Sequence, residues 1–344
     1  MLANKLSFSE STISRVLNGK GDKFRISKKT QQLIIAEASK LNYTPNPMAR
    51  GLRINKTMML GLIIPDISNP FFSSVARRIE DITRKNGYSI ILCDSQENEE
   101  IERQSIKIMQ NRKVDGLIIA PVGLSAEHIE KIQNQGTPVV VIDRYFKNSK
   151  LPFIGSDNYQ GAYDAVDHLI KNGHERIGII KGINGTVPND DRVRGYCDAI
   201  ENNGLQLDES LMVGDSFGEQ NGYFEAKLLM QNENPPSAIF ANSNLITLGV
   251  LRACEDEDIN IPDDLSLVGF DEQPYSRFLK TPMTMVEQKK DEIGYAAMKL
   301  LFNQIEIKQI LRSQNIIIPT TLIIRDSVKK IEKHFINKKI KSLA

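Results

Sequence analysis

The sequence predicts an α/β protein, with a small helical N-terminal head ahead of a core of two doubly wound parallel-sheet subdomains. Residues 1–57 show helical hydrophobic periodicity. From residue 60 onward, short apolar runs alternate with helical stretches, as expected for buried parallel strands joined by right-handed crossovers. That region is too long for one such sheet. We therefore expect two similar halves, the second starting near residues 158–161.

The strands of the core are predicted where apolar residues run without interruption. These runs are 60–65, 89–93, 116–120, 139–142, 176–181, 238–241 and 266–270. Helices are predicted between them, for example over 73–86 and 101–112. Uninterrupted apolar runs indicate strands that are covered by helices on both faces.

Charge is distributed unevenly along the chain. The 44 Lys and Arg and 43 Asp and Glu residues give a net charge of +1. Residues 1–57 hold 11 basic and three acidic residues, a difference of +8, and residues 328–344 hold six Lys and one Glu, a difference of +5. The residues between them must therefore carry −12. A basic head on an acidic body favours a nucleic-acid-binding module attached to a second function, although a solvated charged surface is the alternative.

The composition argues against several classes of protein. Cys93, Cys197 and Cys254 lie far apart with no CxxC spacing, so we expect no disulfide framework and no metal site. No apolar run approaches the roughly 20 residues that span a bilayer, and no secretory signal is apparent. We expect a protein of the cytoplasm without a membrane partner or a cofactor.

The head is predicted to be a helix-turn-helix. Ser9 caps its first helix, Gly19 ends it, and the apolar stripe of that helix consists of Ile13, Val16 and Leu17. Ser27 caps the second helix, whose stripe is expected to consist of Leu33, Ile34, Ala38 and Leu41. Lys28 lies in its first turn, where the helix dipole disfavours a cation and a DNA phosphate would compensate. The predicted DNA contacts of the head are Ser9, Glu10, Ser11, Thr12, Ser14, Arg15, Asn18 and Lys28.

A second DNA-contacting element is predicted just after the head. Asn46 can cap a short helix with Pro47 at its first position. A helix of about two turns is marginal alone in water, so it needs a partner that orders it. Its predicted contact residues are Asn46, Ala49, Arg50, Leu52 and Arg53.

Polar side chains follow many of the predicted strands, and in open α/β sheets ligands bind beyond the carboxyl ends of the strands. Carboxylates, amides and an arginine gathered at one rim form the kind of lining that sugar hydroxyls need. The predicted effector-binding residues are Asn69, Phe71, Asp143, Arg144, Asp157, Arg192, Ser243, Asn244 and Asp271. For any single aspartate at a strand end, a helix cap is the alternative role.

Three ordered motifs resemble the lactose/galactose repressor (LacI/GalR) family. They are the segments 11–19, 41–53 and 61–72, and the resemblance extends from about Leu2 to Ser327. It implies that the helix at 9–18 enters the major groove of operator DNA. It also implies that the 46–53 helix folds on DNA, with Leu52 wedged between base pairs and Ala49 of the paired subunit beside it. Finally, it implies effector contacts by Asn69, Phe71, Arg192 and Asp271, on a periplasmic-binding-protein-like core.

The sequence departs from the family pattern at two places. Only Met1 to Leu6 precede the turn at Ser7, so about one turn or more of the usual first helix is missing. Ser243-Asn244 stands where many relatives have Asn-Asp, which indicates a different sugar specificity.

The resemblance implies the following division of the chain. Residues 1–45 form the helix-turn-helix, 46–57 the hinge helix and linker, 58–158 with 288–318 one effector subdomain, 159–287 with 319–327 the other, and 328–344 a basic tail that is either a weak amphipathic helix or disordered. Two heads on a two-fold axis would bind a pseudo-palindromic operator as a homodimer on the nucleoid, with a small sugar-like effector controlling repression.

Two other functions compete with this interpretation. A sugar-binding protein of the periplasmic-binding type without a DNA-binding role would need an export signal and no basic head, the reverse of what is seen. An enzyme acting on sugars is not favoured, because no GxSxG motif, P-loop or metal-ligand spacing occurs. A pair of carboxylates acting as a glycosidase is not excluded by spacing alone.

Overall fold

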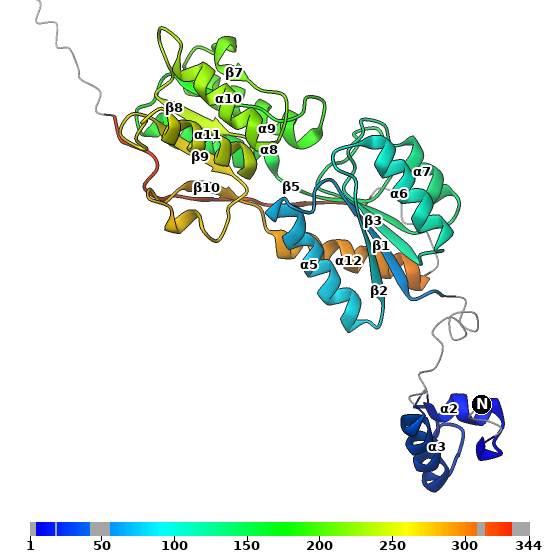
Figure 1. Ribbon diagram of the computed structural model, residues 1–344. Coiled ribbons are helices and arrows are strands. Elements are labelled where there is room, and N and C mark those ends of the chain that lie inside the picture. The colour runs from blue at the N-terminus through cyan, green and yellow to red at the C-terminus, as the bar shows by residue number, and fades with distance from the viewer. Residues whose placement is uncertain (1–4, 18, 42–55, 308–313, 332–344) are drawn as a thin grey trace, which may run out of the picture. The chain divides into compact units, whose positions relative to one another are not determined.

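The computed structural model describes residues 5–17, 19–41, 56–307 and 314–331. The chain divides after Met59 into two units, a head and a core, which are treated separately (Figure 1). The predicted DNA contacts Asn18, Asn46, Ala49, Arg50, Leu52 and Arg53 lie outside the described residues, as does the tail beyond Ile331.

The head contains helices α2 (Glu10–Leu17) and α3 (Lys28–Lys40), which pack against each other. Its core consists of Ile13, Val16, Ile34 and Ala38, with Leu6, Phe8, Leu17 and Ile26 around them. Ser27 caps α3 by accepting a hydrogen bond from the Thr30 amide, as predicted. The prediction was wrong for Leu33 and Leu41, which are 49% and 44% exposed. The buried stripe of α3 is therefore narrower than the periodicity indicated.

The first sheet of the core has the strand order β11-β5-β4-β3-β1-β2, and we call this half lobe 1. Its strands are β1 (Met59–Ile64), β2 (Ser89–Asp94), β3 (Gly116–Ile119), β4 (Val139–Ile142), β5 (Phe153–Ser156) and β11 (Asn315–Ile318). Its helices are α5 (Pro70–Lys85), α6 (Glu99–Asn111), α7 (Glu127–Asn134) and α12 (Lys290–Ile307). Helices α5 and α12 pack side by side.

The second sheet has the order β12-β10-β9-β8-β6-β7 and forms lobe 2. Its strands are β6 (Ile177–Ile180), β7 (Met212–Val213), β8 (Ala238–Ala241), β9 (Ser266–Phe270), β10 (Thr284–Glu287) and β12 (Thr321–Ile323). The helices are α8 (Asn158–Lys171), α9 (Val187–Asn202), α10 (Glu219–Met230) and α11 (Asn244–Asp256), with short turns η1 (Glu209–Leu211) and η2 (Ser276–Phe278). β12 pairs antiparallel with β10, whereas β6, β8, β9 and β10 pair in parallel.

The apolar runs form strands because both of their faces are covered. On β8, Ala238 and Phe240 belong to a cluster under α8 and α9. Ile239 and Ala241, which point the other way, belong to a cluster under α10 and α11. The two-residue alternation of a strand thus supplies two separate cores. This doubly wound arrangement confirms the predicted fold class.

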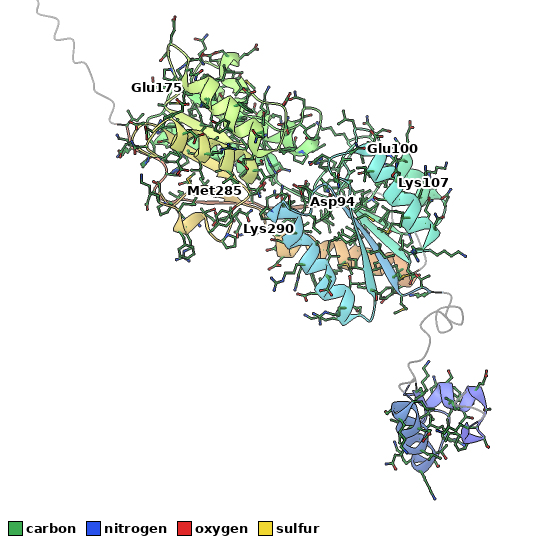
Figure 2. The ribbon with its side chains drawn as sticks, viewed as in Figure 1. Asp94, Glu100, Lys107, Glu175, Met285 and Lys290 are labelled. Carbon is green, nitrogen blue, oxygen red and sulfur yellow. The ribbon has the colours of Figure 1, made fainter. Side chains whose placement is uncertain are left out.

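The chain passes between the lobes at three places in the described residues. These are β5 to α8, β10 to α12 and β11 to β12. Met285 on β10 and Lys290 at the start of α12 mark the second crossing (Figure 2). The first and third crossings are joined, because the Asp157 amide donates to the Ile318 carbonyl over 2.9 Å. All three crossings lie beside the strand ends that position the site.

Two segments differ from the sequence-based expectation. Helix α5 begins at Pro70 instead of residue 73, because Asn69 caps it and proline suits the first helical turn. Residues 328–331 at the start of the predicted tail are irregular but attached to lobe 2. The Ile331 amide donates to the Asn172 carbonyl, and the Lys329 carbonyl lies 3.1 Å from His174 Nε2.

None of the helices in the described ranges is long and apolar enough to cross a membrane.

Candidate ligand-binding site

A small cavity lies where the strand ends of lobes 1 and 2 face each other. Its volume is about 30 Å³. It is lined by Asn69, Phe71, Phe72, Glu97, Asp143, Arg144, Pro188, Arg192, Phe217, Ser243, Asp271 and Gln288. Such a volume accommodates about one or two water molecules. A larger ligand therefore enters only when the lobes or the lining side chains move apart.

Two aspartates of the cavity stand at equivalent strand ends in a rare backbone conformation. Asp143 follows β4 with φ +62°, and Asp271 follows β9 with φ +70°. Both are nearly buried, at 7% and 6% exposed. Aspartate and asparagine tolerate this left-handed region better than most residues. The turn after each strand therefore places one carboxylate from each lobe at the cavity.

Arg192 of lobe 2 lines the cavity and is only 3% exposed. Its Nε donates to Asn158 Oδ1 over 2.9 Å, and its Nη1 donates to the Asn242 carbonyl over 2.6 Å. The guanidinium carbon lies 3.7 Å from the centre of the Phe270 ring, a cation–π contact. These contacts leave Nη2 as the nitrogen of Arg192 without a hydrogen bond to a described residue.

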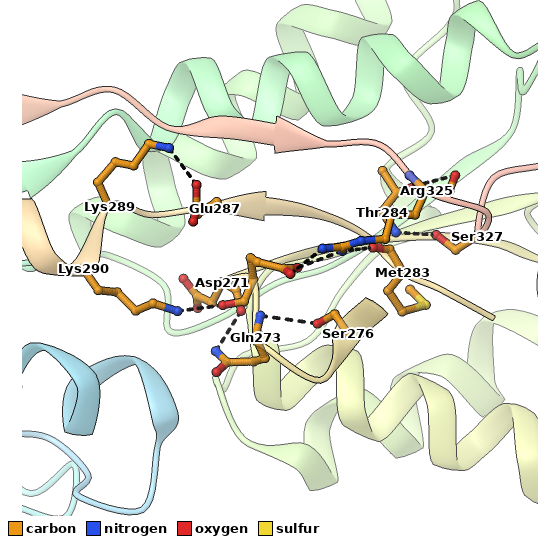
Figure 3. A network of polar contacts seen from close by, with 11 residues as sticks. Asp271, Gln273, Ser276, Met283, Thr284, Glu287, Lys289, Lys290, Arg325 and Ser327 are labelled. Atoms are coloured by element: carbon orange, nitrogen blue, oxygen red, sulfur yellow. Dashed lines mark hydrogen bonds and ion pairs between the residues drawn. The ribbon is translucent and has the colours of Figure 1, made fainter. Parts of the chain in front are cut away.

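Asp271 joins the cavity to the segments that cross between the lobes. Its carboxylate accepts a hydrogen bond from Gln288 Nε2, and Gln288 Oε1 is buried without a partner among the described residues. Beside it, the Glu272 carboxylate accepts hydrogen bonds from both terminal nitrogens of Arg325, over 3.0 and 2.6 Å. Figure 3 shows Asp271 after β9 and Arg325 after β12 on either side of β10, together with neighbouring polar contacts.

The charges of the cavity shift the pKa of Asp143. Burial raises the pKa of its carboxyl group to about 6, and the neighbouring Arg144 and Arg192 offset part of that effect. Burial also lowers the pKa of Arg192. For Arg144, burial acts against the charged form, but the hydrogen bonds and charge of Glu97 outweigh it and raise the pKa. A ligand that donates hydrogen bonds to Asp143 therefore favours its ionised form.

Contacts across the cavity link the lobes directly. Asn244 Nδ2 donates to Asn69 Oδ1 over 3.0 Å, and Arg144 lies 5.3 Å from the centre of the Phe217 ring. A second, larger hollow of about 370 Å³ adjoins the cavity at Arg144 and is lined by residues 144–149 and 185–187, among others.

Seven of the nine predicted effector residues line the cavity, namely Asn69, Phe71, Asp143, Arg144, Arg192, Ser243 and Asp271. Asn244 does not line the cavity itself, but it donates a hydrogen bond to the lining residue Asn69. Asp157 does not line it. Instead it caps α8 by accepting from the Gln160 amide over 3.0 Å, the alternative role for a strand-end aspartate.

The predicted set did not contain five residues that line the cavity: Phe72, Glu97, Pro188, Phe217 and Gln288. Glu97 follows β2, so a search for polar residues just after the predicted strands could have found it. Phe217 follows β7, which has only two residues and therefore gives no apolar run to search from.

Comparisons with known proteins agree with this architecture. The family described as "Periplasmic binding proteins and sugar binding domain of LacI family" matches residues 57–326. The chain is 32% identical to catabolite control protein A of Priestia megaterium, over 95% of this chain and 98% of that protein. It is 34% identical to the ribose operon repressor of Halalkalibacterium halodurans, over 95% and 96% of the two chains. The chain belongs to the LacI family of transcriptional regulators.

A solved structure of a LacI-family regulator from Enterococcus faecium with bound ribose is also similar, with a TM-score of 0.70 and 27% identity over 80% of this chain and all of that one. The curated relatives match both head and core and are named as regulators, not enzymes. These findings favour a transcriptional regulator over the two alternatives, an exported sugar-binding protein and an enzyme.

In this LacI-family chain, the described DNA-contact candidates of the head lie on or beside α2. Ser9 caps α2 by accepting a hydrogen bond from the Thr12 amide over 3.2 Å, and its Oγ also lies 2.9 Å from the Ser11 and Thr12 hydroxyl oxygens. Glu10, Ser14 and Arg15 follow on α2, and Arg15 lies 4.1 Å from the centre of the Phe24 ring. Lys28 is paired with Asp22 at 2.8 Å, and this hydrogen bond lowers the pKa of Asp22. The charge of Lys28 therefore has a partner within the head, so the position of Lys28 in the first turn of α3 does not require a DNA phosphate.

The raised pKa of Asp143 predicts a pH-dependent effector affinity. A ligand that donates a hydrogen bond to this carboxylate, as a sugar hydroxyl does, binds the ionised form of Asp143. We expect the dissociation constant for such a ligand, with ribose as the probe, to rise by up to about tenfold per pH unit below 6, and to be flat between pH 7 and 8. Calorimetry at pH 5.0 and 7.5, in buffers of different ionisation enthalpy, measures both affinity and proton release. Equal affinities at the two pH values, without proton release, would contradict this role for Asp143.

Proposed function

We propose that this LacI-family regulator is a homodimeric repressor of carbohydrate-metabolism genes. It binds double-stranded operator DNA, and a small uncharged sugar of about pentose size, such as ribose, controls that binding. The observation that carries the effector assignment is the balance of groups in the cavity. Three carboxylates, Glu97, Asp143 and Asp271, face two guanidinium groups, Arg144 and Arg192.

Sugar hydroxyls suit this lining because each both donates and accepts hydrogen bonds. The carboxylates of Asp143 and Asp271 accept from hydroxyls, and Nη2 of Arg192 donates to them. The rings of Phe71, Phe72 and Phe217 cover the apolar C–H faces of a sugar ring. The ribose operon repressor and the ribose-bound regulator among the relatives support the same class of ligand.

We further propose the domain division predicted from the sequence, with residues 46–57 as the hinge between head and core. Because both lobes contribute to one cavity, a bound sugar stabilises one relative position of the lobes. The difference in sugar affinity between the DNA-bound and free states sets the coupling, typically about 1–3 kcal/mol. The protein would act in the cytoplasm, on the nucleoid.

Lobe 2 offers an apolar face suited to the homodimer. On α10, Phe224 and Leu228 are one turn apart and 62% and 57% exposed, and Leu248 on the adjacent α11 is 42% exposed. Burial of such side chains against a second copy favours association by about 25 cal/mol per Å² of apolar surface.

The proposed function is tested with DNA that the protein itself selects from a random duplex pool. Fluorescence anisotropy then measures affinity for the selected duplex with and without ribose. We expect two chains per duplex and a change in affinity of roughly 5- to 150-fold on adding ribose. Failure to enrich any sequence would contradict operator recognition, and an unchanged affinity would contradict ribose as the effector.

Leu52→Ala is expected to weaken specific operator binding by about tenfold or more, because an apolar wedge that unstacks a base step is lost. Non-specific binding and its salt dependence should persist, since no phosphate contact is removed. Anisotropy on selected and random duplexes over a salt series measures both. Leu33→Ala, at the exposed position on α3, is the matched control. An equal loss on random DNA would show that Leu52 does not act as a wedge.

A further inference from the structure

One ion pair at the cavity joins Glu97 to Arg144. Glu97, in the loop between β2 and α6, receives both terminal nitrogens of Arg144: Nη1 donates to Oε2 over 2.7 Å and Nη2 to Oε1 over 2.6 Å. The Arg144 side chain is only 6% exposed, whereas that of Glu97 is 34% exposed. The Arg144 Nε is buried without a hydrogen-bond partner among the described residues. The edge of Arg144 formed by Nη1 and Nη2 is therefore occupied by Glu97.

That edge is the part of arginine that recognises phosphate, because two parallel N–H groups match two phosphate oxygens. In Arg192, the other guanidinium of the cavity, one nitrogen of each edge is already bonded. Its Nε and Nη1 are bonded to Asn158 and to the Asn242 carbonyl. Arg144 keeps a second edge, formed by Nε and Nη2, but its Nε is buried. Neither arginine therefore offers a phosphate group two accessible, unbonded nitrogens along one edge unless side chains move.

The remaining charges also disfavour an anion. With Glu97 neutralising Arg144, the carboxylates of Asp143 and Asp271 face Arg192, and both are nearly buried. A phosphate in this space would meet like charge at low dielectric, where repulsion is strong.

The loop that carries Glu97 has an unusual backbone. Gln96 and Glu97 have φ +52° and +53°, a region that residues other than glycine, asparagine and aspartate seldom occupy. The conformation is held by the Gln96 amide donating to Asp94 Oδ1 over 2.9 Å and the Glu97 amide donating to the Pro65 carbonyl over 3.0 Å. Strained backbone of this kind persists where the surroundings over-determine it and is often found at functional sites.

We propose that Glu97 is a specificity-determining residue that makes the cavity accept neutral sugars and exclude phosphorylated ones. It does so by occupying the phosphate-recognising edge of Arg144 and cancelling its charge. Specificity is obtained by disfavouring the wrong ligand as well as by favouring the right one. This inference rests on the proposed function for the sugar, but the exclusion of phosphate can be tested without it.

The test measures ribose, ribose 5-phosphate and inorganic phosphate by calorimetry on the full chain and on Glu97→Gln and Glu97→Ala. Glu97→Gln removes the charge, and Glu97→Ala also opens space beside Arg144. The control is Glu100→Gln, which removes one charge from the exposed surface of α6, where Figure 2 labels Glu100. Thermal melting confirms that each variant is folded.

We expect the native chain to prefer ribose over ribose 5-phosphate by about 100-fold or more, and at least one Glu97 variant to reduce that ratio by about tenfold through tighter phosphate-ester binding. Inorganic phosphate should likewise bind the variant but not the native chain or Glu100→Gln. The role of Glu97 is overturned if neither variant gains affinity for either phosphate, or if the native chain binds both sugars equally. If the native chain does not bind ribose but the Glu97 variants bind ribose 5-phosphate or inorganic phosphate, only the proposed effector is contradicted.

Discussion

Asp143→Asn and Asp271→Asn are each expected to weaken ribose binding by about 10- to 100-fold, and the double variant by at least about 100-fold. A hydrogen bond to a charged group contributes about 1.5–3 kcal/mol, and each substitution replaces a carboxylate acceptor by a neutral amide. The backbone should be undisturbed, because asparagine is also tolerated at φ +62° and +70°. Calorimetric titration with ribose measures the loss.

The stability of the same variants separates a ligand contact from a folding defect. Because the pKa of Asp143 is raised to about 6 in the folded protein, its ionised form opposes folding above pH 6, and this penalty is absent below pH 4. Asp143→Asn should therefore unfold at an equal or higher denaturant concentration at pH 7 while it binds ribose more weakly. Asp258→Asn, at an exposed position with φ +54°, is the matched control and should change neither property. Unchanged ribose affinity in the double variant would refute the assignment of the cavity.

Gly249→Ala is expected to destabilise the core by about 3 kcal/mol, near the upper end of the usual cost of overpacking. A Cβ at Gly249 would lie 2.1 Å from the Glu219 carbonyl oxygen and 2.5 Å from the Tyr223 amide nitrogen. These are backbone atoms of α10, so no side-chain rotation relieves the clash. Helices α10 and α11 would have to separate, which would loosen the cluster around Val250 and Leu229. Urea unfolding at equilibrium measures the change.

The sign of this effect is informative because helix propensity alone predicts the opposite. In an exposed helix, replacing glycine by alanine stabilises by about 1 kcal/mol. Gly218→Ala serves as the control, since the nearest atom to its added Cβ is Ser216 Oγ at 3.6 Å, and it should change stability by less than about 1 kcal/mol. A Gly249→Ala protein as stable as the parent would mean that the two helices do not approach so closely.

The search for polar residues just after predicted strands, which we call the strand-end rule, located much of the cavity from the sequence. In a parallel sheet the carboxyl ends of the strands lie at one edge, so the sequence predicts that Asp143 and Arg144 lie at the ligand-binding edge of one sheet and Asp271 at that of the other. The rule could not separate ligand contacts from caps, because both need a polar residue at a strand end. Asp157 is such a cap, whereas Ser243 caps α11 and lines the cavity as well.

Residue periodicity, ordered motifs and local charge are properties of the linear chain, so they were enough to predict the family, the doubly wound core and the basic head. Which charged groups form pairs depends on the folding of distant segments onto one another, and the sequence pattern does not contain that information. Glu97 and Arg144 are 47 residues apart and come together because β2 and β4 lie in one sheet, with a left-handed backbone at Gln96 and Glu97 completing the approach. The same holds for Phe217 and for the partners of Arg192. Burial and pairing are properties of three-dimensional neighbours, and they decide whether a cavity rich in arginine favours a phosphate or a neutral sugar.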